Sequence, residues 1–353
     1  MTTRFPRREH PTPSFPPTRR SWRTAVIAVG VAVAIVSVSA CSSSADESGA
    51  GDGEAGAEGW SFEHDRGITH TLPEVPNVIA AQSVPAGGLW EYGVEIAGVF
   101  GPLRQTDGSP DPAIGLADPA AFTSLGEVDS EINIEALAAL QPDIIVTSMW
   151  DDDTFWGIAD DVVDELEQIA PIVGIRVDNR PITDPLRRYA ELADSLGADP
   201  ARITEARTGF EAASTKLSDA LRAKPELTVV ASSGTPSEMY IAYPPGFPDL
   251  AYYETLGMQL VTPESHPTSG GFWETLSWEQ AGKYPADLIL ADARGGTVAQ
   301  IHDRLPPTAA ALPAVQADQL ISWPAVHAYG YGNLAAIIDD LAGAVAEASQ
   351  DIT

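Results

Sequence analysis

The stretch LGEVDSEINIEALAALQPDIIVTSMW, residues 125–150, decides the fold of this chain because its pattern returns once near the C-terminus, as LSWEQAGKYPADLILADAR at residues 276–294. In each copy a glutamate stands eight residues before an aspartate that opens an apolar run: Glu135 and Asp143 in the first, Glu279 and Asp287 in the second. Each copy predicts a short helix leading into a buried parallel strand. Two such units predict an α/β fold of two lobes with central, mainly parallel sheets, related by a pseudo-two-fold axis.

The segment between the two copies determines how the lobes are joined. Residues 184–223 carry the only extended helical periodicity there, with prolines placed as at helix starts. We therefore expect an N-terminal α/β lobe at residues 61–183, a connecting helical segment at 184–223 with a long helix, and a C-terminal α/β lobe at 224–353. Ligands of such open sheets bind beyond the carboxyl ends of the strands, so a ligand cleft is expected between the lobes.

Local patterns place further elements within each lobe. Residues 75–80 predict the first buried strand, and residues 90–98 the helix and turn that follow it. In the second lobe, residues 227–232 and 238–242 predict strands, and residues 333–348 predict a final helix.

The N-terminal region has the composition of an export signal. Six arginines and one acid in residues 1–24 precede an apolar run at residues 25–38, which is short for a membrane-spanning helix. The only cysteine, Cys41, follows in the sequence VSAC, which resembles the lipobox of bacterial lipoproteins. We expect a signal peptide at residues 1–40, then a lipidated (palmitate-bearing) Cys41 and a flexible acidic tether through residue 60. The protein would be exported, by the general or the twin-arginine route, and anchored to the outer face of the cell membrane.

Composition excludes several classes of function. The 50 acidic residues outnumber the 20 basic ones, for a formal net charge of −30, so nucleic acid is not an expected partner. The six histidines show no paired spacing, so no metal site is expected. No G-x-S-x-G, no phosphate-binding glycine loop and no free cysteine nucleophile is present, so the chain is not expected to be an enzyme. The acidity indicates either a well-solvated surface or a field that favours cationic ligands.

Several stretches resemble, in this order and spacing, those of the substrate-binding lipoproteins of ABC importers for ferric siderophores, haem and cobalamin. The stretches are INIEALAALQPDIIV, EQIAPIVGI, YAELADSLGAD, LSWEQAGKYPADLIL and LPAVQADQLISWP, and the resemblance covers residues 62–348. It implies a monomeric clamp with a rigid backbone and no intrinsic cofactor, which holds a ferric siderophore between its lobes and delivers it to a permease dimer. By the same resemblance, Glu135 and Glu279 would each engage an arginine of the permease.

Ten residues are the candidates for contact with the ligand. Most are large aromatic residues that follow predicted strands, and they suit a bulky, partly apolar molecule. They are Trp90, Arg104, Met149, Trp150, Tyr240, Phe272, Trp273, Arg294, Trp323 and Tyr329.

The acidic residues near the expected cleft restrict the charge of the expected ligand. Hydroxamate-siderophore binders of the family often carry an arginine after the glycine at the head of the first motif, whereas here Gly126 is followed by Glu127. An acidic entrance to the ligand cleft favours a neutral or cationic trihydroxamate chelate over an anionic triscatecholate, unless Arg104, Arg176 or Arg294 turns inward. Haem, with His327 or Tyr329 as the iron ligand, cobalamin, and a sensory role for a surface lipoprotein remain alternatives.

Overall fold

The computed structural model describes residues 59–264 and 271–353. The predicted signal peptide and Cys41 lie outside the described residues. Within the described part, no helix combines the length and the apolar character needed to cross a bilayer. The described chain begins with a hairpin of two short antiparallel strands, β1 (Trp60–Glu63) and β2 (Thr69–Leu72).

The N-terminal lobe is built on four parallel strands in the order β4-β3-β5-β6. The strands are β3 (Ile79–Gln82), β4 (Gly98–Phe100), β5 (Ile144–Met149) and β6 (Ile172–Arg176). All six residues of β5 are buried, because helices cover both faces of the sheet. One face packs against α1 (Ser83–Glu91) and α4 (Thr183–Ser195), the other against α2 (Ile134–Leu140) and α3 (Val163–Ile169).

The C-terminal lobe has a mixed sheet in the order β10-β8-β7-β11-β12, with β9 beside β7. Four strands are parallel, namely β7 (Thr228–Gly234), β9 (Gln259–Leu260), β11 (Leu288–Asp292) and β12 (Leu320–Trp323). The antiparallel strands are β8 (Glu238–Ala242) and β10 (Trp273–Ser277). The predicted class, two α/β lobes with mainly parallel sheets, is confirmed.

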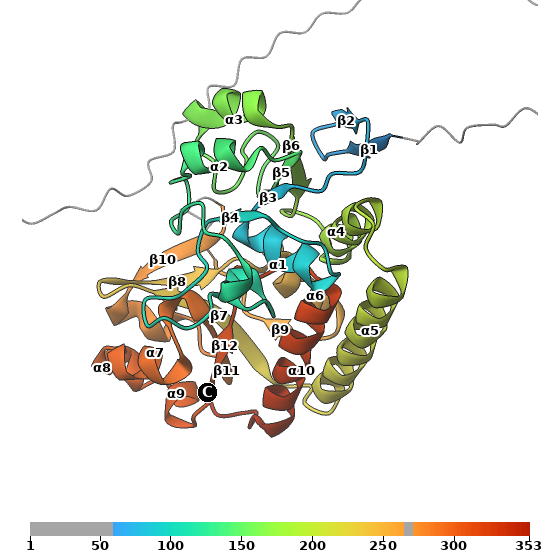
Figure 1. The fold of residues 1–353 in the computed structure, drawn as a ribbon. Helices are drawn as coiled ribbons and strands as arrows, with labels where there is room; N and C mark the ends of the chain where they lie inside the picture. Colours follow the sequence, from blue (N-terminus) through green and yellow to red (C-terminus); the bar gives the residue numbers. More distant parts are fainter. Residues whose placement is uncertain (1–58, 265–270) are drawn as a thin grey trace, which may run out of the picture. The chain divides into compact units, whose positions relative to one another are not determined.

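Two sets of helices cover this second sheet. One face packs against α5 (Pro200–Arg222), α6 (Pro248–Thr255) and α10 (Tyr331–Glu347). The other carries a 3-10 turn, η5 (Trp278–Lys283), and three short helices, α7 (Val298–Arg304), α8 (Pro307–Ala310) and α9 (Pro313–Gln316). Figure 1 shows α5 and α10 side by side.

The two sequence copies adopt the same local hydrogen-bond pattern. In the first, Asp143 donates its backbone N–H to Val78 O (2.7 Å) and accepts the Val78 N–H with Oδ2 (2.9 Å). In the second, Asp287 donates its N–H to Thr228 O (2.9 Å) and accepts the Thr228 N–H with Oδ2 (3.0 Å). Each aspartate thereby fixes the start of its own strand against the start of the neighbouring one.

Two local predictions were wrong. The helix expected at residues 90–98 lies earlier, as α1, because Gln82 caps it by accepting the Val84 N–H (2.8 Å). The sequence of α1 does not predict a helix, because it contains a proline and two glycines, which have low helix propensity. A Cβ at one of these glycines, Gly87, would overlap the backbone of Ile114, so close packing requires it. The short helix expected in the second copy is the 3-10 turn η5 rather than an α-helix.

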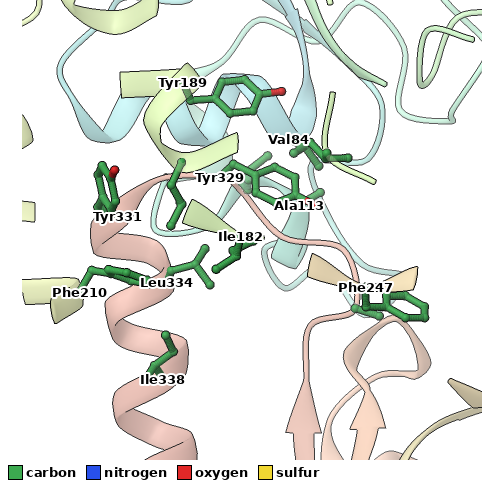
Figure 2. Packing of buried hydrophobic residues seen from close by; sticks show 14 of the residues in the cluster. Val84, Ala113, Ile182, Tyr189, Phe210, Phe247, Tyr329, Tyr331, Leu334 and Ile338 are labelled. Carbon is green, nitrogen blue, oxygen red and sulfur yellow. The ribbon is translucent and has the colours of Figure 1, made fainter. Parts of the chain in front are cut away.

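One hydrophobic core runs through both lobes. Figure 2 shows Tyr189 and Val84 of the first lobe packed near Tyr329, while Leu334 and Ile338 continue the same cluster along α10. The rings of Tyr189 and Tyr329 are stacked, with centroids 5.9 Å apart.

A carboxylate of the first lobe also caps a helix of the second. Glu91, at the end of α1, accepts the backbone N–H groups of Gly332 (2.6 Å) and Asn333 (2.8 Å) at the start of α10. The neighbouring Tyr92 hydroxyl accepts the Tyr331 N–H (2.9 Å). Since Gly330, the residue that precedes α10, has no side chain to cap the helix, the first lobe supplies the missing acceptors.

Candidate functional site

A group of aromatic side chains lies on one face of the C-terminal sheet. We call it the aromatic wall: Tyr240, Phe247, Phe272, Trp273 and Trp323. Tyr240 and Trp273 lie on the paired antiparallel strands β8 and β10, two residues apart in register, and their ring centroids are 6.4 Å apart. Phe247 is central, with ring centroids 5.0 Å from Trp273, 5.1 Å from Trp323 and 5.6 Å from Phe272.

Phe247 was not among the candidates chosen from the sequence. It lies in the segment YPPGFP that follows β8, immediately before α6. An aromatic residue among prolines, just beyond a predicted strand, was the available signal.

Trp150 brings the first lobe to this group. It directly follows β5, is half-buried, and meets Phe272 edge-on with ring centroids 5.4 Å apart. Its other aromatic neighbour is Trp156, at 5.9 Å in its own lobe. Trp150, Phe272, Trp273 and Tyr240, four of the sequence candidates, therefore form one connected surface with only partly buried rings.

Two other candidates lie deeper. Trp323 is 2% exposed, and its indole Nε1 donates to the Asp249 carboxylate at 2.7 Å. Tyr329 is 3% exposed beneath the junction of the lobes, stacked on Tyr189 and beside the buried His327 ring at 4.9 Å. The structure therefore makes Trp323 a buried member of the aromatic wall and encloses both proposed iron ligands, His327 and Tyr329, in the core.

Three further candidates also lie away from the aromatic wall. Met149 is 1% exposed and belongs to the N-terminal core, because the last residue of β5 points toward Gly174 and Phe155. Trp90 is 37% exposed in the last turn of α1. Arg104 donates to Gly108 O within its own loop at 3.0 Å.

Arg294 lies in a strongly acidic setting. Its guanidinium binds Asp292 of its own lobe, with the shortest distance 2.6 Å from Nη2 to Oδ2. Burial raises the pKa of both Asp111 and Asp129 of the first lobe, and the positive charge of Arg294 opposes the shift at each. Nearby, Gln300 donates to Asp107 across the lobes at 3.1 Å. One guanidinium therefore faces carboxylates from both lobes.

The two motif glutamates are exposed on the surface, one in each lobe. Glu135 lies in the first turn of α2, and Glu279 lies in η5. A hydrogen bond from Ser277 lowers the pKa of Glu279, so this side chain is a carboxylate at neutral pH. Both are accessible to a partner.

A separate cavity of about 370 Å³ lies on the opposite face of the C-terminal sheet, beneath α7 and α8. Its lining includes Met239, Ile289 and Leu305 and none of the aromatic wall, so it is not the candidate site. Across residues 59–264 and 271–353, no cluster of three or more His, Cys, Asp or Glu side chains is arranged to hold a metal ion.

Comparisons with known proteins agree with this geometry. A family profile described as "Periplasmic binding protein" matches residues 118–326. The solved structure of DesE, a ferric-siderophore receptor protein from Streptomyces coelicolor, is 38% identical and superposes with a TM-score of 0.78, covering 82% of this chain and 99% of DesE. No curated protein sequence matches significantly.

More distant solved structures share the fold. The petrobactin-binding protein YclQ from Bacillus subtilis is 15% identical with a TM-score of 0.63, covering 82% of this chain and 99% of YclQ. SirA from Staphylococcus aureus, solved with staphyloferrin B, is 17% identical with a TM-score of 0.58 and the same two coverages. These relatives are binding proteins rather than enzymes. With the family match and the identity to DesE, this chain belongs to the periplasmic binding protein family.

Proposed function

We propose that this protein is the extracytoplasmic substrate-binding component of an ABC importer and captures a ferric siderophore between its lobes. The observation that carries the proposal is the edge-on contact of Trp150 with Phe272, which joins the aromatic wall to the first lobe at the carboxyl end of β5. Flat rings contributed by both lobes give a bulky chelate a large contact area at low entropic cost. The relationship to DesE, described as a ferric-siderophore receptor, supports the same function.

We further propose that the preferred chelate is a neutral or cationic trihydroxamate. Arg294 is already bound to Asp292, and Arg176 is bound to Asp178 (2.7 Å) and to Asp152. With these two guanidinium groups neutralised and Asp129 beside Arg294, an anionic triscatecholate would meet a net negative field.

The test is a tryptophan-fluorescence titration of the exported domain, residues 59–353. One arm uses the ferric complex of a linear trihydroxamate with a primary amine, and the other a ferric triscatecholate. Tight binding of the trihydroxamate and weak binding of the triscatecholate is expected. The reverse order would overturn the charge argument, and binding of neither, with saturable binding of haem or cobalamin instead, would replace the siderophore as ligand.

Anchoring and delivery complete the proposal. A lipid on Cys41 would hold the domain at the outer face of the membrane, while Glu135 and Glu279 would each engage an arginine of one permease subunit. Labelling with a radioactive fatty acid tests the anchor, and Cys41→Ala is expected to abolish the label and release the protein from the membrane fraction. A chain that stays membrane-bound and unlabelled would show an uncleaved anchor instead.

A further inference from the structure

Asp249 is a buried carboxylate with an unusual partner. It lies in the first turn of α6, is 2% exposed, and its Oδ2 accepts the indole N–H of Trp323 at 2.7 Å. Burial raises the pKa of Asp249, while the nearby His327 and the hydrogen bonds from Trp323 and the Leu250 N–H oppose that shift. A carboxyl group persists so deep in a protein only where such partners offset the loss of water.

The indole that Asp249 holds is the base of the aromatic wall. The Trp323 ring lies 5.1 Å from Phe247, which is 4% exposed, and 6.0 Å from the half-buried Trp273. From there, Phe247 contacts Phe272, which contacts Trp150 of the other lobe. A rotation of the Trp323 indole about its side-chain bonds would therefore displace the half-buried Trp273 and, through Phe247, the half-buried Phe272.

The hydrogen bonding around Asp249 favours this directed role over a general stabilising one. Tyr253, one helical turn further along α6, carries a fully buried hydroxyl without a hydrogen-bond partner in the described part of the chain. A buried hydroxyl left unpaired is costly, and a carboxylate four residues away on the same helix is within the usual reach of such a group. The carboxylate instead accepts a hydrogen bond from Trp323, which is 74 residues away in the sequence.

We propose that Asp249 is a positioning residue for ligand recognition, which fixes the indole plane of Trp323 and thereby the orientation of Trp273 and Phe247 in the aromatic wall. This inference rests on the proposed function, because it concerns recognition at that same site. Asp249 does not touch the ligand and acts through Trp323. The ligand class it serves is a bulky chelate that needs several aromatic rings at fixed angles.

The test compares Asp249→Leu with Asp249→Asn and Trp323→Phe in the domain of residues 59–353. Asn keeps an oxygen acceptor for the indole N–H, whereas Leu removes it while keeping the same number of side-chain heavy atoms and the same branching. We expect Asp249→Leu and Trp323→Phe each to weaken binding of the ferric trihydroxamate about tenfold or more, and Asp249→Asn to weaken it less than about threefold. The double variant should bind no more weakly than Trp323→Phe alone, since the two residues act as one unit.

Trp60→Phe is the matched control. Trp60 is also a buried indole, 4% exposed, and donates to Ser195 Oγ at 3.1 Å, but it lies in the β1 hairpin strand. Its replacement should lower the melting temperature without changing the dissociation constant. If Asp249→Leu behaves in the same way, with a lower melting temperature and unchanged affinity, the proposal is overturned and Asp249 is structural only.

A second measurement separates this proposal from the proposed function. Near-ultraviolet circular dichroism of the ligand-free domain reports how Trp323 and Trp273 are mutually oriented, whatever ligand the protein binds. Asp249→Leu is expected to change the aromatic bands and Asp249→Asn to keep them; an unchanged spectrum for Asp249→Leu would also overturn the proposal. If the wild-type domain ignores the trihydroxamate, the function fails while the spectrum still tests the positioning. If Asp249→Leu does not fold, the affinity of Trp323→Phe decides, and an unchanged dissociation constant for that variant overturns the proposal.

Discussion

The aspartates that precede β5 and β11 occupy equivalent places in the two lobes but make different hydrogen bonds and differ in burial. Asp143 is half-buried and binds two backbone N–H groups, those of Asn77 (2.8 Å) and Val78 (2.9 Å). Asp287 is 1% exposed and binds the Thr228 N–H, the Thr228 hydroxyl and, with Oδ1, the Ile352 N–H. The first joins two strands, and the second also ties down the C-terminal end of the chain.

The difference shows how each lobe secures the segment that adjoins it. The N-terminal lobe holds its hairpin with an ion pair and with buried rings. Asp65 accepts the Arg188 guanidinium (2.9 Å) and the backbone N–H of Arg176 (2.9 Å), and Trp60 and Phe62 belong to the hydrophobic core. The C-terminal lobe secures its last residues with a buried network, in which Gln319 donates to Ser349 O (2.9 Å) beside Asp287. The motif aspartate is thus part of the attachment of the last residues in the second lobe, whereas the hairpin of the first lobe is attached by residues outside the motif.

The largest expected effect is that of Asp287→Ala. It leaves two N–H groups and one hydroxyl unpaired in a buried site, so we expect a loss of about 3 kcal/mol in the free energy of unfolding. Urea denaturation followed by circular dichroism measures it. A loss below about 1 kcal/mol would mean that water replaces the carboxylate as hydrogen-bond acceptor. The two aspartates would then not differ in their contribution to stability.

Acidification should weaken the attachment of the N-terminal hairpin. Burial, with the charges of His70 and Arg66, lowers the pKa of His64 to about 4, and its Nδ1 accepts the Arg66 N–H at 3.3 Å. Between the ordinary pKa of 6.5 and about 4, the unfolded chain binds a proton that the folded chain excludes. Stability due to this group is therefore complete above pH 6.5 and falls as the pH drops, by about 2 kcal/mol between pH 7.5 and 5.

This second prediction is measured as the difference between wild type and His64→Gln in denaturant titrations at several pH values. The variant should lack that part of the acid sensitivity. Parallel curves for the two proteins over this range would show that His64 titrates alike in the folded and unfolded chains.

Asp143→Ala should cost less than its counterpart. Water can reach the Asn77 N–H, which is exposed, so a loss of about 1 kcal/mol is expected. The same denaturation experiment measures it. If Asp143→Ala is as damaging as Asp287→Ala, burial does not explain the difference between the two copies.

The smallest effect on stability is expected at the glutamates that precede these aspartates. Glu135→Ala and Glu279→Ala remove exposed side chains, so the urea midpoint of unfolding should stay close to that of the wild type, and ligand affinity should not change. Uptake of radio-iron trihydroxamate by cells should nevertheless fall about tenfold for either variant. Glu205→Ala, on the exposed side of α5, is the control and should transport normally. Normal uptake by the double variant would remove the docking role.

The repeated pattern was predictable from the sequence because each buried strand is a continuous apolar run with an acid at its start. The type of helix in the second copy was not, because the capping box between Ser277 and Gln280 marks where a helix begins but does not distinguish a 3-10 turn from an α-helix. At the candidate site, the expectation that aromatic residues follow strands was correct for Trp150, which follows β5, whereas Trp273 is the first residue of β10. The burial of Trp323 and the role of Phe247 depend on the packing of α6 against the sheet. This packing cannot be predicted from the local sequence pattern.

Contacts between segments that are distant in the sequence could not be predicted from it either. Trp150 and Phe272 meet only because both lobes share one core, and Asp249 gives no sign in the sequence that its partner is Trp323. Pairings over such separations follow from the assembled fold, not from the propensities of nearby residues.

The capping of α10 by Glu91 has a consequence for how such proteins can be recombined. A Cβ at Gly330 would overlap the Glu91 carboxylate, and one at Gly332 would lie 3.1 Å from Oε1. The glycines and the glutamate therefore form a matched set although they belong to different lobes. A chimaera that takes its first lobe from one relative and its second from another must inherit all three together, or α10 loses its cap and the junction between the parental halves fails.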